Sequence, residues 1–224
     1  MVNTELLQEC KLFQSLRKEE QELLSLNITK VQYMMGEPIV KIGEFANHVL
    51  FIVKGYVKIH TDYKNKSLII SISPPGSFPG LSTMIGVPKH RLNITAIDDT
   101  VMYLININIF RTLIETNGCF AMEALQIVND SLLQFIEHNL MSLTHNNIHG
   151  RLANILLFLS EKIFFSDHFD LLLSRKELSQ YANISRENVI KILYEFSHEG
   201  IIKLNSKNIK IVNPDQLRRY AEIS

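Results

Sequence analysis

The sequence has few cysteines and no long apolar run. Cys10 and Cys119 are too few for a disulfide framework and match no metal-ligand spacing. The most apolar stretches, such as Ile155–Leu159, are far shorter than the roughly 20 residues that a membrane helix needs. The N-terminus has no basic flank followed by an apolar core, so it does not resemble a secretory signal. We therefore expect a cytoplasmic chain without membrane contacts.

Charge of one sign is also lacking. The 23 Lys and Arg residues balance 23 Asp and Glu residues, and basic residues are only slightly in excess after Asn146. Overall charge therefore gives no argument for nucleic-acid binding, and the placement of individual side chains has to supply one.

Patterns of catalytic residues are missing too. The strand-rich region contains no Ser-His-Asp set, no paired carboxylates and no glycine-rich phosphate loop at the start of a helix. We therefore expect no enzymatic activity.

What the chain does contain is a strand-rich half between helical segments. Apolar spacing over Thr4–Leu26, broken near Gln14–Ser15, predicts two short helices. β-branched and aromatic runs then alternate with Gly, Pro, Asn and Asp, which is typical of an antiparallel sandwich or barrel. The predicted strands are Lys30–Met34, Pro38–Ile42, Val49–Val53, Tyr56–His60, Leu68–Ser73, Leu92–Ala96 and Thr100–Ile105.

Helical periodicity returns from about Ile107 to Thr144. Two adjacent apolar stripes indicate a second buried surface besides the one that seats the helix on its own domain. The stripes are Ala121, Leu125, Val128, Leu132 and Phe135, and Leu133, Ile136, Leu140 and Leu143. We assign the first stripe to a homodimer interface; the alternative is a helix enclosed within its own monomer.

A stretch near the C-terminus has the pattern of a helix-turn-helix. Ser174 with Glu177 forms a capping box at the start of one helix. Asn183 suits the turn because asparagine tolerates the left-handed conformation. Ser185 then caps a second helix, Arg186–Ser197. Beyond Gly200, the runs Ile201–Leu204 and Ile209–Val212 are expected to pair as a hairpin wing.

The second helix has a polar face at its start. Its apolar residues Val189, Ile192, Leu193 and Phe196 share one side, which turns Arg186, Glu187, Asn188 and Lys191 outward. Arginine can donate two hydrogen bonds to guanine, and glutamate can accept one from cytosine. Adjacent residues do not pair along a helix, so no local ion pair accounts for Arg186 and Glu187. This face is where a recognition helix contacts base edges in the major groove.

These motifs resemble the Crp–Fnr family of bacterial transcription regulators. The family's Ser-Arg-Glu-x-Val-x-Arg helix appears as Ser185 to Lys191, with lysine at the last position. Gly36–Ile59 resembles the family's paired Gly-Glu turns and the strand pair that follows, and Gly150-Arg151-Leu152-Ala153 resembles the start of its DNA-binding domain. The resemblance implies an α+β fold: an antiparallel β jelly roll of the cyclic-nucleotide-binding type over 1–115, a long dimerisation helix over 116–145, and a winged helix-turn-helix over 146–224.

The resemblance also implies a function. We expect a homodimeric, sequence-specific regulator that binds a pseudo-palindromic duplex, responds to an effector in its roll and works with RNA polymerase. Arg186 and Glu187 would read a G·C pair and Lys191 a neighbouring guanine, although lysine lacks bidentate geometry. Arg175 and Ser185 would contact phosphates, and Ser174 and Asn188 complete the expected DNA-binding set. The alternative is a ligand-binding module whose helix-turn-helix contacts proteins.

The effector is harder to predict. Relatives that bind cyclic nucleotides have Gly-x-Phe-x-Gly-Glu followed by Arg-Ser or Arg-Thr-Ala, whereas this chain has Leu81 in place of the glutamate. Leucine cannot accept a bond from a ribose hydroxyl, and the neighbours of Arg91 do not match, which argues against a cyclic nucleotide. Another effector and no effector both stay open. The candidate effector residues are Gly76, Ser77, Phe78, Gly80, Leu81, Arg91, Thr95 and Ala96.

The number of possible ligand residues limits which other cofactors the chain could bind. A 4Fe-4S cluster needs four thiolates, and the chain has two. Haem stays open because histidines and methionines are present. His145 and His149 have the i, i+4 spacing of some metal pairs but no third ligand nearby, so we expect no metal site.

Overall fold

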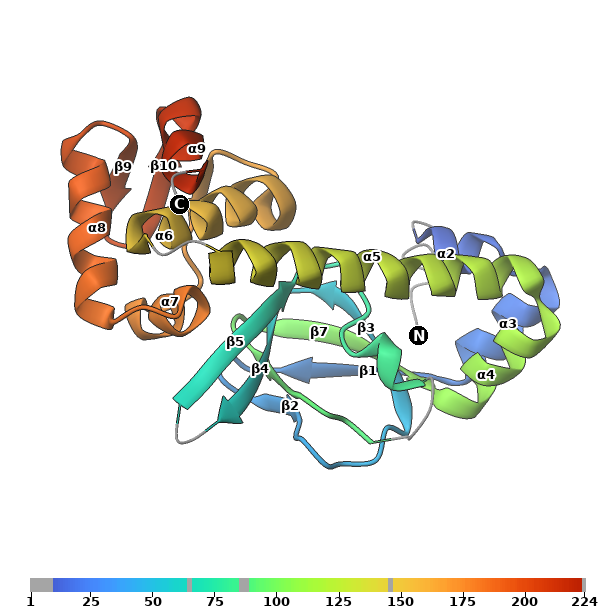
Figure 1. The fold of residues 1–224 in the computed structure, drawn as a ribbon. Helices are drawn as coiled ribbons and strands as arrows, with labels where there is room; N and C mark the ends of the chain where they lie inside the picture. The colour runs from blue at the N-terminus through green and yellow to red at the C-terminus, as the bar shows by residue number, and fades with distance from the viewer. Residues whose placement is uncertain (1–9, 64–65, 85–88, 145–146, 223–224) are drawn as a thin grey trace. The chain divides into compact units, whose positions relative to one another are not determined.

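The computed structural model describes residues 10–63, 66–84, 89–144 and 147–222 (Figure 1). The chain divides into two compact units, Met1–His60 with Ser73–Gln134 and Thr61–Ile72 with Phe135–Ser224. Within the described residues, no helix has both the length and the apolar composition needed to cross a bilayer.

The strand-rich region contains two antiparallel sheets, with strand orders β1-β7-β3 and β2-β6-β4-β5. Each predicted strand is present, with bounds shifted by up to a few residues. The strands are β1 (Ile28–Tyr33), β2 (Pro38–Val40), β3 (His48–Lys54), β4 (Val57–Tyr63), β5 (Lys66–Ser73), β6 (Asn93–Ala96) and β7 (Thr100–Asn106), and the short 3-10 helix η1 (Leu81–Met84) follows β5.

Within residues 10–27, two short helices precede the strands, as predicted. They are α2 (Lys11–Gln14) and α3 (Lys18–Leu26), and the break between them lies at the expected position. The start of the predicted helical stretch, Thr4–Glu9, lies outside the described residues.

An aromatic cluster forms the larger core of the first unit. Phe13 packs edge-on against Phe51, with ring centroids 5.4 Å apart, and Phe51 lies 4.8 Å from Phe78. Leu81 and Tyr103 are buried in the same cluster. The corner after β5 therefore contributes side chains to the core.

The predicted helical stretch from Ile107 is interrupted. It forms α4 (Ile107–Thr116) and α5 (Gly118–Thr144), which are separated by the buried residue Asn117. The Asn117 amide donates to the Ser15 carbonyl (3.1 Å) and to Glu20 (2.7 Å), and its oxygen accepts from the backbone N–H of Phe120 (3.1 Å). This asparagine ties the start of α5 to the N-terminal helices.

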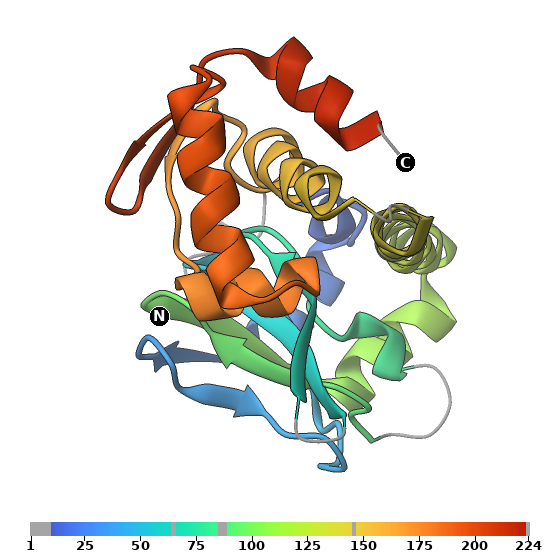
Figure 2. The same ribbon diagram turned by 60° about the vertical axis from the view of Figure 1, so that its left-hand side comes forward.

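The C-terminal part contains the helix-turn-helix and a small sheet. Its helices are α6 (Ile148–Phe158), which continues into the π-helix η2 (Leu159–Phe164), α7 (Arg175–Ala182), α8 (Arg186–His198) and α9 (Pro214–Glu222). β8 (His168–Asp170), β9 (Ile202–Asn205) and β10 (Asn208–Ile211) form a sheet in the order β8-β10-β9. Figure 2 shows the predicted hairpin of β9 and β10 beside α8. β8 and α9 were not predicted from the sequence.

Candidate nucleic-acid interface

The start of α7 is fixed by the predicted capping box. Ser174 Oγ accepts from the Glu177 backbone N–H (3.2 Å), and Glu177 accepts from the backbone N–H of Ser174 (2.9 Å). Asn183 takes the left-handed conformation at φ 51° and ends the helix. The Arg151 guanidinium, on α6, donates to the Asn183 carbonyl (3.2 Å) and so holds the turn against a third helix.

The start of α8 is fixed by a single serine cap. Ser185 accepts from the Asn188 backbone N–H (3.1 Å). The four residues predicted to face the core are buried to 1% exposure or less: Val189, Ile192, Leu193 and Phe196. Arg186, Glu187 and Lys191 are exposed and Asn188 is half-buried, so the first turns of α8 present a polar face to solvent.

A glutamate on α8 contacts two side chains, one on its own helix and one at the start of α6. Glu195 lies 3.6 Å from Lys191 Nζ and accepts from His149 Nε2 at 2.8 Å. The bond from His149 and the nearby Lys191 lower the pKa of the Glu195 carboxyl. The i, i+4 spacing of Lys191 and Glu195 could have predicted the first pair. No sequence signal connects His149 with a residue 46 positions away.

Arg175 links the helix-turn-helix to the wing. Its Nη2 donates to the Ser206 carbonyl (2.8 Å) in the turn between β9 and β10, where Ser206 has φ 55°. Burial lowers the pKa of the Arg175 guanidinium. Arginine has five N–H donors, so this bond does not preclude a phosphate contact.

Leu125 and Leu132 of α5 point away from the face that packs on the core. Phe120 and Ala124 are buried in the core of the first unit, and Val128 packs against it. Leu125 and Leu132, from the predicted dimer stripe, are 54% and 53% exposed. Among the described side chains, the other exposed large apolar residues of α5 are Met122, Leu133, Phe135 and Ile136. Ala121 is half-buried. The side chains of Leu140 and Leu143 lie outside the described residues.

The candidate effector residues are divided between the core and the surface. Phe78, Leu81 and Ala96 are buried, and Arg91 is exposed. Thr95 is hydrogen-bonded to His60 at 2.9 Å. Gly76 and Gly80 have positive φ, as the expected tight corner requires, and Ser77 donates to the Pro74 carbonyl. The turn over residues 76–81 is retained, but Phe78 and Leu81, its two largest side chains, pack into the core.

Comparison with known proteins agrees with this architecture. The Crp-like helix-turn-helix domain family matches residues 150–220, and the cyclic nucleotide-binding domain family matches residues 30–117. A CRP-like cAMP-activated global transcriptional regulator from Mycobacterium tuberculosis is 25% identical to this chain, with 97% of this chain and 99% of the relative covered. The chain belongs to the Crp–Fnr family. The predicted family, fold class and lack of enzymatic activity are thus confirmed: this member is a DNA-binding transcription regulator.

Other Crp–Fnr proteins show how far the likeness extends. The cAMP-activated regulator CRP of Escherichia coli is 26% identical, with 80% of this chain and 88% of the relative covered. The solved structure of FixK2 from Bradyrhizobium japonicum has the same fold, with a TM-score of 0.81, 23% identity and coverage of 88% of this chain and 98% of the other.

Proposed function

We propose that the chain acts in the cytoplasm as a homodimer that inserts α8 of each copy into successive major grooves of a pseudo-palindromic site. The observation that supports this proposal is the exposed pair Arg186 and Glu187 on the first turn of α8, above a closed apolar core. Arg186 donates to guanine and Glu187 accepts from the paired cytosine. Lys191 contacts a neighbouring guanine.

Phosphate contacts fix the register of the helix on the duplex. We assign them to Arg175 and Ser185, with Ser174 and Asn188 beside them. Ser185 and Ser174 lie at the N-termini of α8 and α7, where backbone N–H groups and the helix dipole favour an anion.

The proposed domain boundaries are those expected from the sequence. The roll covers 1–115, the dimerisation helix 116–145 and the winged helix-turn-helix 146–224. The two family matches, which end at 117 and begin at 150, support this division.

The proposed homodimer rests on α5. Leu125 and Leu132 with the neighbouring exposed apolar residues form a row that a second copy of the same helix would cover. Regulation would then act on the spacing of the two α8 helices, through an effector in the roll. The bound dimer would also contact RNA polymerase. Co-purification of the regulator and the polymerase on promoter DNA tests this contact.

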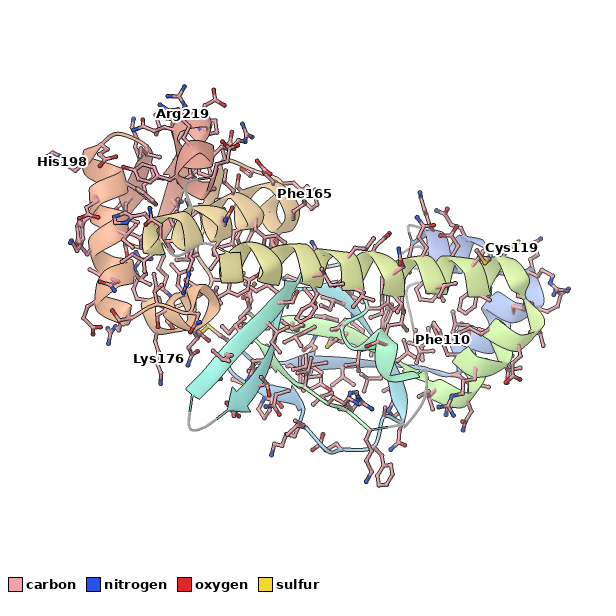
Figure 3. All side chains as sticks on the ribbon, viewed as in Figure 1. Phe110, Cys119, Phe165, Lys176, His198 and Arg219 are labelled. Carbon is pink, nitrogen blue, oxygen red and sulfur yellow. The ribbon has the colours of Figure 1, made fainter. Side chains whose placement is uncertain are left out.

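The decisive experiment measures sequence preference. A site is selected from random duplexes, and fluorescence anisotropy compares it with a scrambled duplex at two salt concentrations. Arg186→Ala and Glu187→Ala should each lose about 1–3 kcal/mol of discrimination at their base pair while the protein remains folded. Arg219→Ala removes an exposed arginine on α9 (Figure 3) and serves as the matched control. Undiminished preference in both α8 variants would refute the assignment.

A further inference from the structure

One outward residue of α8 differs in character from its neighbours. Ile190 lies one turn after Arg186 and one turn before Tyr194, and it is 36% exposed. The charged residues Glu187 and Lys191 lie beside it on the helix. The surface that we propose for DNA therefore includes an apolar side chain.

The fold does not account for this isoleucine. Val189, Ile192 and Leu193 are at most 1% exposed, so the core beneath α8 is closed by other residues. Isoleucine also favours helix formation less than alanine, leucine or lysine because its branched side chain is restricted there. Helix propensity therefore does not favour a β-branched residue at position 190, and about a third of this apolar side chain is left exposed to a ligand.

Ile190 lies on a partly exposed side of α8, between the buried face and the outermost residues. Residues at four-residue steps along a helix share one side, here Arg186, Ile190, Tyr194 and His198. Tyr194 is 67% exposed. His198, at the end of the row, points away from the body of the unit (Figure 3). A ligand approaching this side would meet Arg186 and Ile190 together.

The major groove offers one apolar group on its base edges, the C5-methyl group of thymine. Isoleucine has one strongly preferred rotamer in a helix, so its methyl groups are held in a fixed direction. We propose that Ile190 is a specificity-determining residue that packs against the methyl group of a thymine. This inference rests on the proposed function, because it requires α8 to lie in the groove.

Helix geometry limits where that thymine lies. Four residues advance a helix by about 6 Å, and successive base pairs are about 3.4 Å apart. Ile190 therefore reaches a base pair one or two steps from the guanine that Arg186 contacts.

The test removes the methyl group without changing base pairing. A duplex is selected with the unaltered protein, and each of its thymines is replaced in turn by deoxyuridine. Replacement at one thymine per half-site, one or two pairs from the guanine, should weaken binding about fourfold for each half-site. Ile190→Ala should bind the thymine and deoxyuridine duplexes equally, and Ile190→Val should retain the difference. Val212→Ala, which shortens a 46% exposed side chain elsewhere in the unit, should also retain it.

The outcomes distinguish a failure of the role of Ile190 from a failure of the proposed function. Specific binding that is indifferent to every deoxyuridine, or an Ile190→Ala protein that still discriminates, would overturn the role of Ile190 and leave the regulator assignment intact. A protein that selects no duplex would contradict the proposed function and this inference with it.

Discussion

Glu195 has two partners at once, and this arrangement matters both for stability and for DNA binding. His149 bonds one carboxylate oxygen and Lys191 approaches the other. Lys191 is also one of the side chains assigned to a base. Under the proposed function, Glu195 would compete with DNA for Lys191.

The lowered pKa of Glu195 gives a pH-dependent prediction. A carboxyl whose pKa is lower in the folded state adds stability above its ordinary pKa and loses it as the pH falls through the folded value. Glu195→Gln should therefore lower the urea midpoint near neutral pH, and the difference should shrink below about pH 4. Glu222→Gln, an exposed glutamate on α9, is the control. A difference that grows at low pH would contradict the assignment.

Gly55 tests a different constraint, the close approach of two backbone segments. It has φ +85°, and a Cβ atom there would lie 2.6 Å from the Asp99 carbonyl oxygen and 2.7 Å from Thr100 Cα. Gly36 has nearly the same φ, +86°, with nothing within 4 Å. Gly36→Ala should cost about 1–2 kcal/mol from backbone strain alone. Gly55→Ala should cost about 3–5 kcal/mol because the clash adds to the strain. Equal losses in urea unfolding would show that the close contact relaxes at little cost.

Elements that depend on local chemistry were predictable from the sequence. The capping box at Ser174, the left-handed Asn183 and the cap at Ser185 involve residues within a few positions of one another, and each prediction is confirmed. Alternation of apolar residues likewise located the seven strands. The buried face of α8 was predictable from the helical spacing of its apolar residues.

Elements that depend on distant partners were not predictable. Asn117 breaks the helical stretch because its amide has partners about 100 positions away, at Ser15 and Glu20. β8 has three residues and is stabilised by pairing with β10, which follows 40 positions later. The same holds for the bond between Arg175 and Ser206.

The helix α5 gives a prediction about assembly. Leu125→Glu combined with Leu132→Glu places two charges in the exposed apolar row and should convert a dimer into a monomer, as measured by size exclusion with light scattering. Gln134→Glu is the control because position 134 lies about half a turn around the helix from Leu125. Two outcomes would count against the interface: an unaltered protein that is monomeric, or a double variant that keeps the dimer mass.

For the whole molecule, the proposed two-fold symmetry would set the spacing of the DNA site. The half-sites should lie about 34 Å apart on one face of the duplex. Insertion of about five base pairs turns one half-site to the opposite face and should reduce the affinity about 100-fold or more. Phosphate contacts should also make binding strongly salt-dependent. Affinity that survives the insertion unchanged would argue against a symmetric dimer.

The response of the whole molecule to ligand is a further prediction. A ligand at 100 times its Kd adds about 2.7 kcal/mol to stability, which raises the Tm by several degrees. Since Leu81 is buried in the core at the position of the family's ribose-binding glutamate, cyclic AMP at millimolar concentration should leave the Tm within about 1 °C. A rise of several degrees in a thermal melt would place a nucleotide in the roll after all.

The bond from Arg175 to the Ser206 carbonyl has a consequence for how substitutions in the wing act during evolution. The turn of the wing is hydrogen-bonded to α7, so a displacement of one affects the other. Under the proposed function, a substitution in the hairpin turn that breaks this bond would change how the wing and α7 sit together, even where the turn itself contacts no nucleotide.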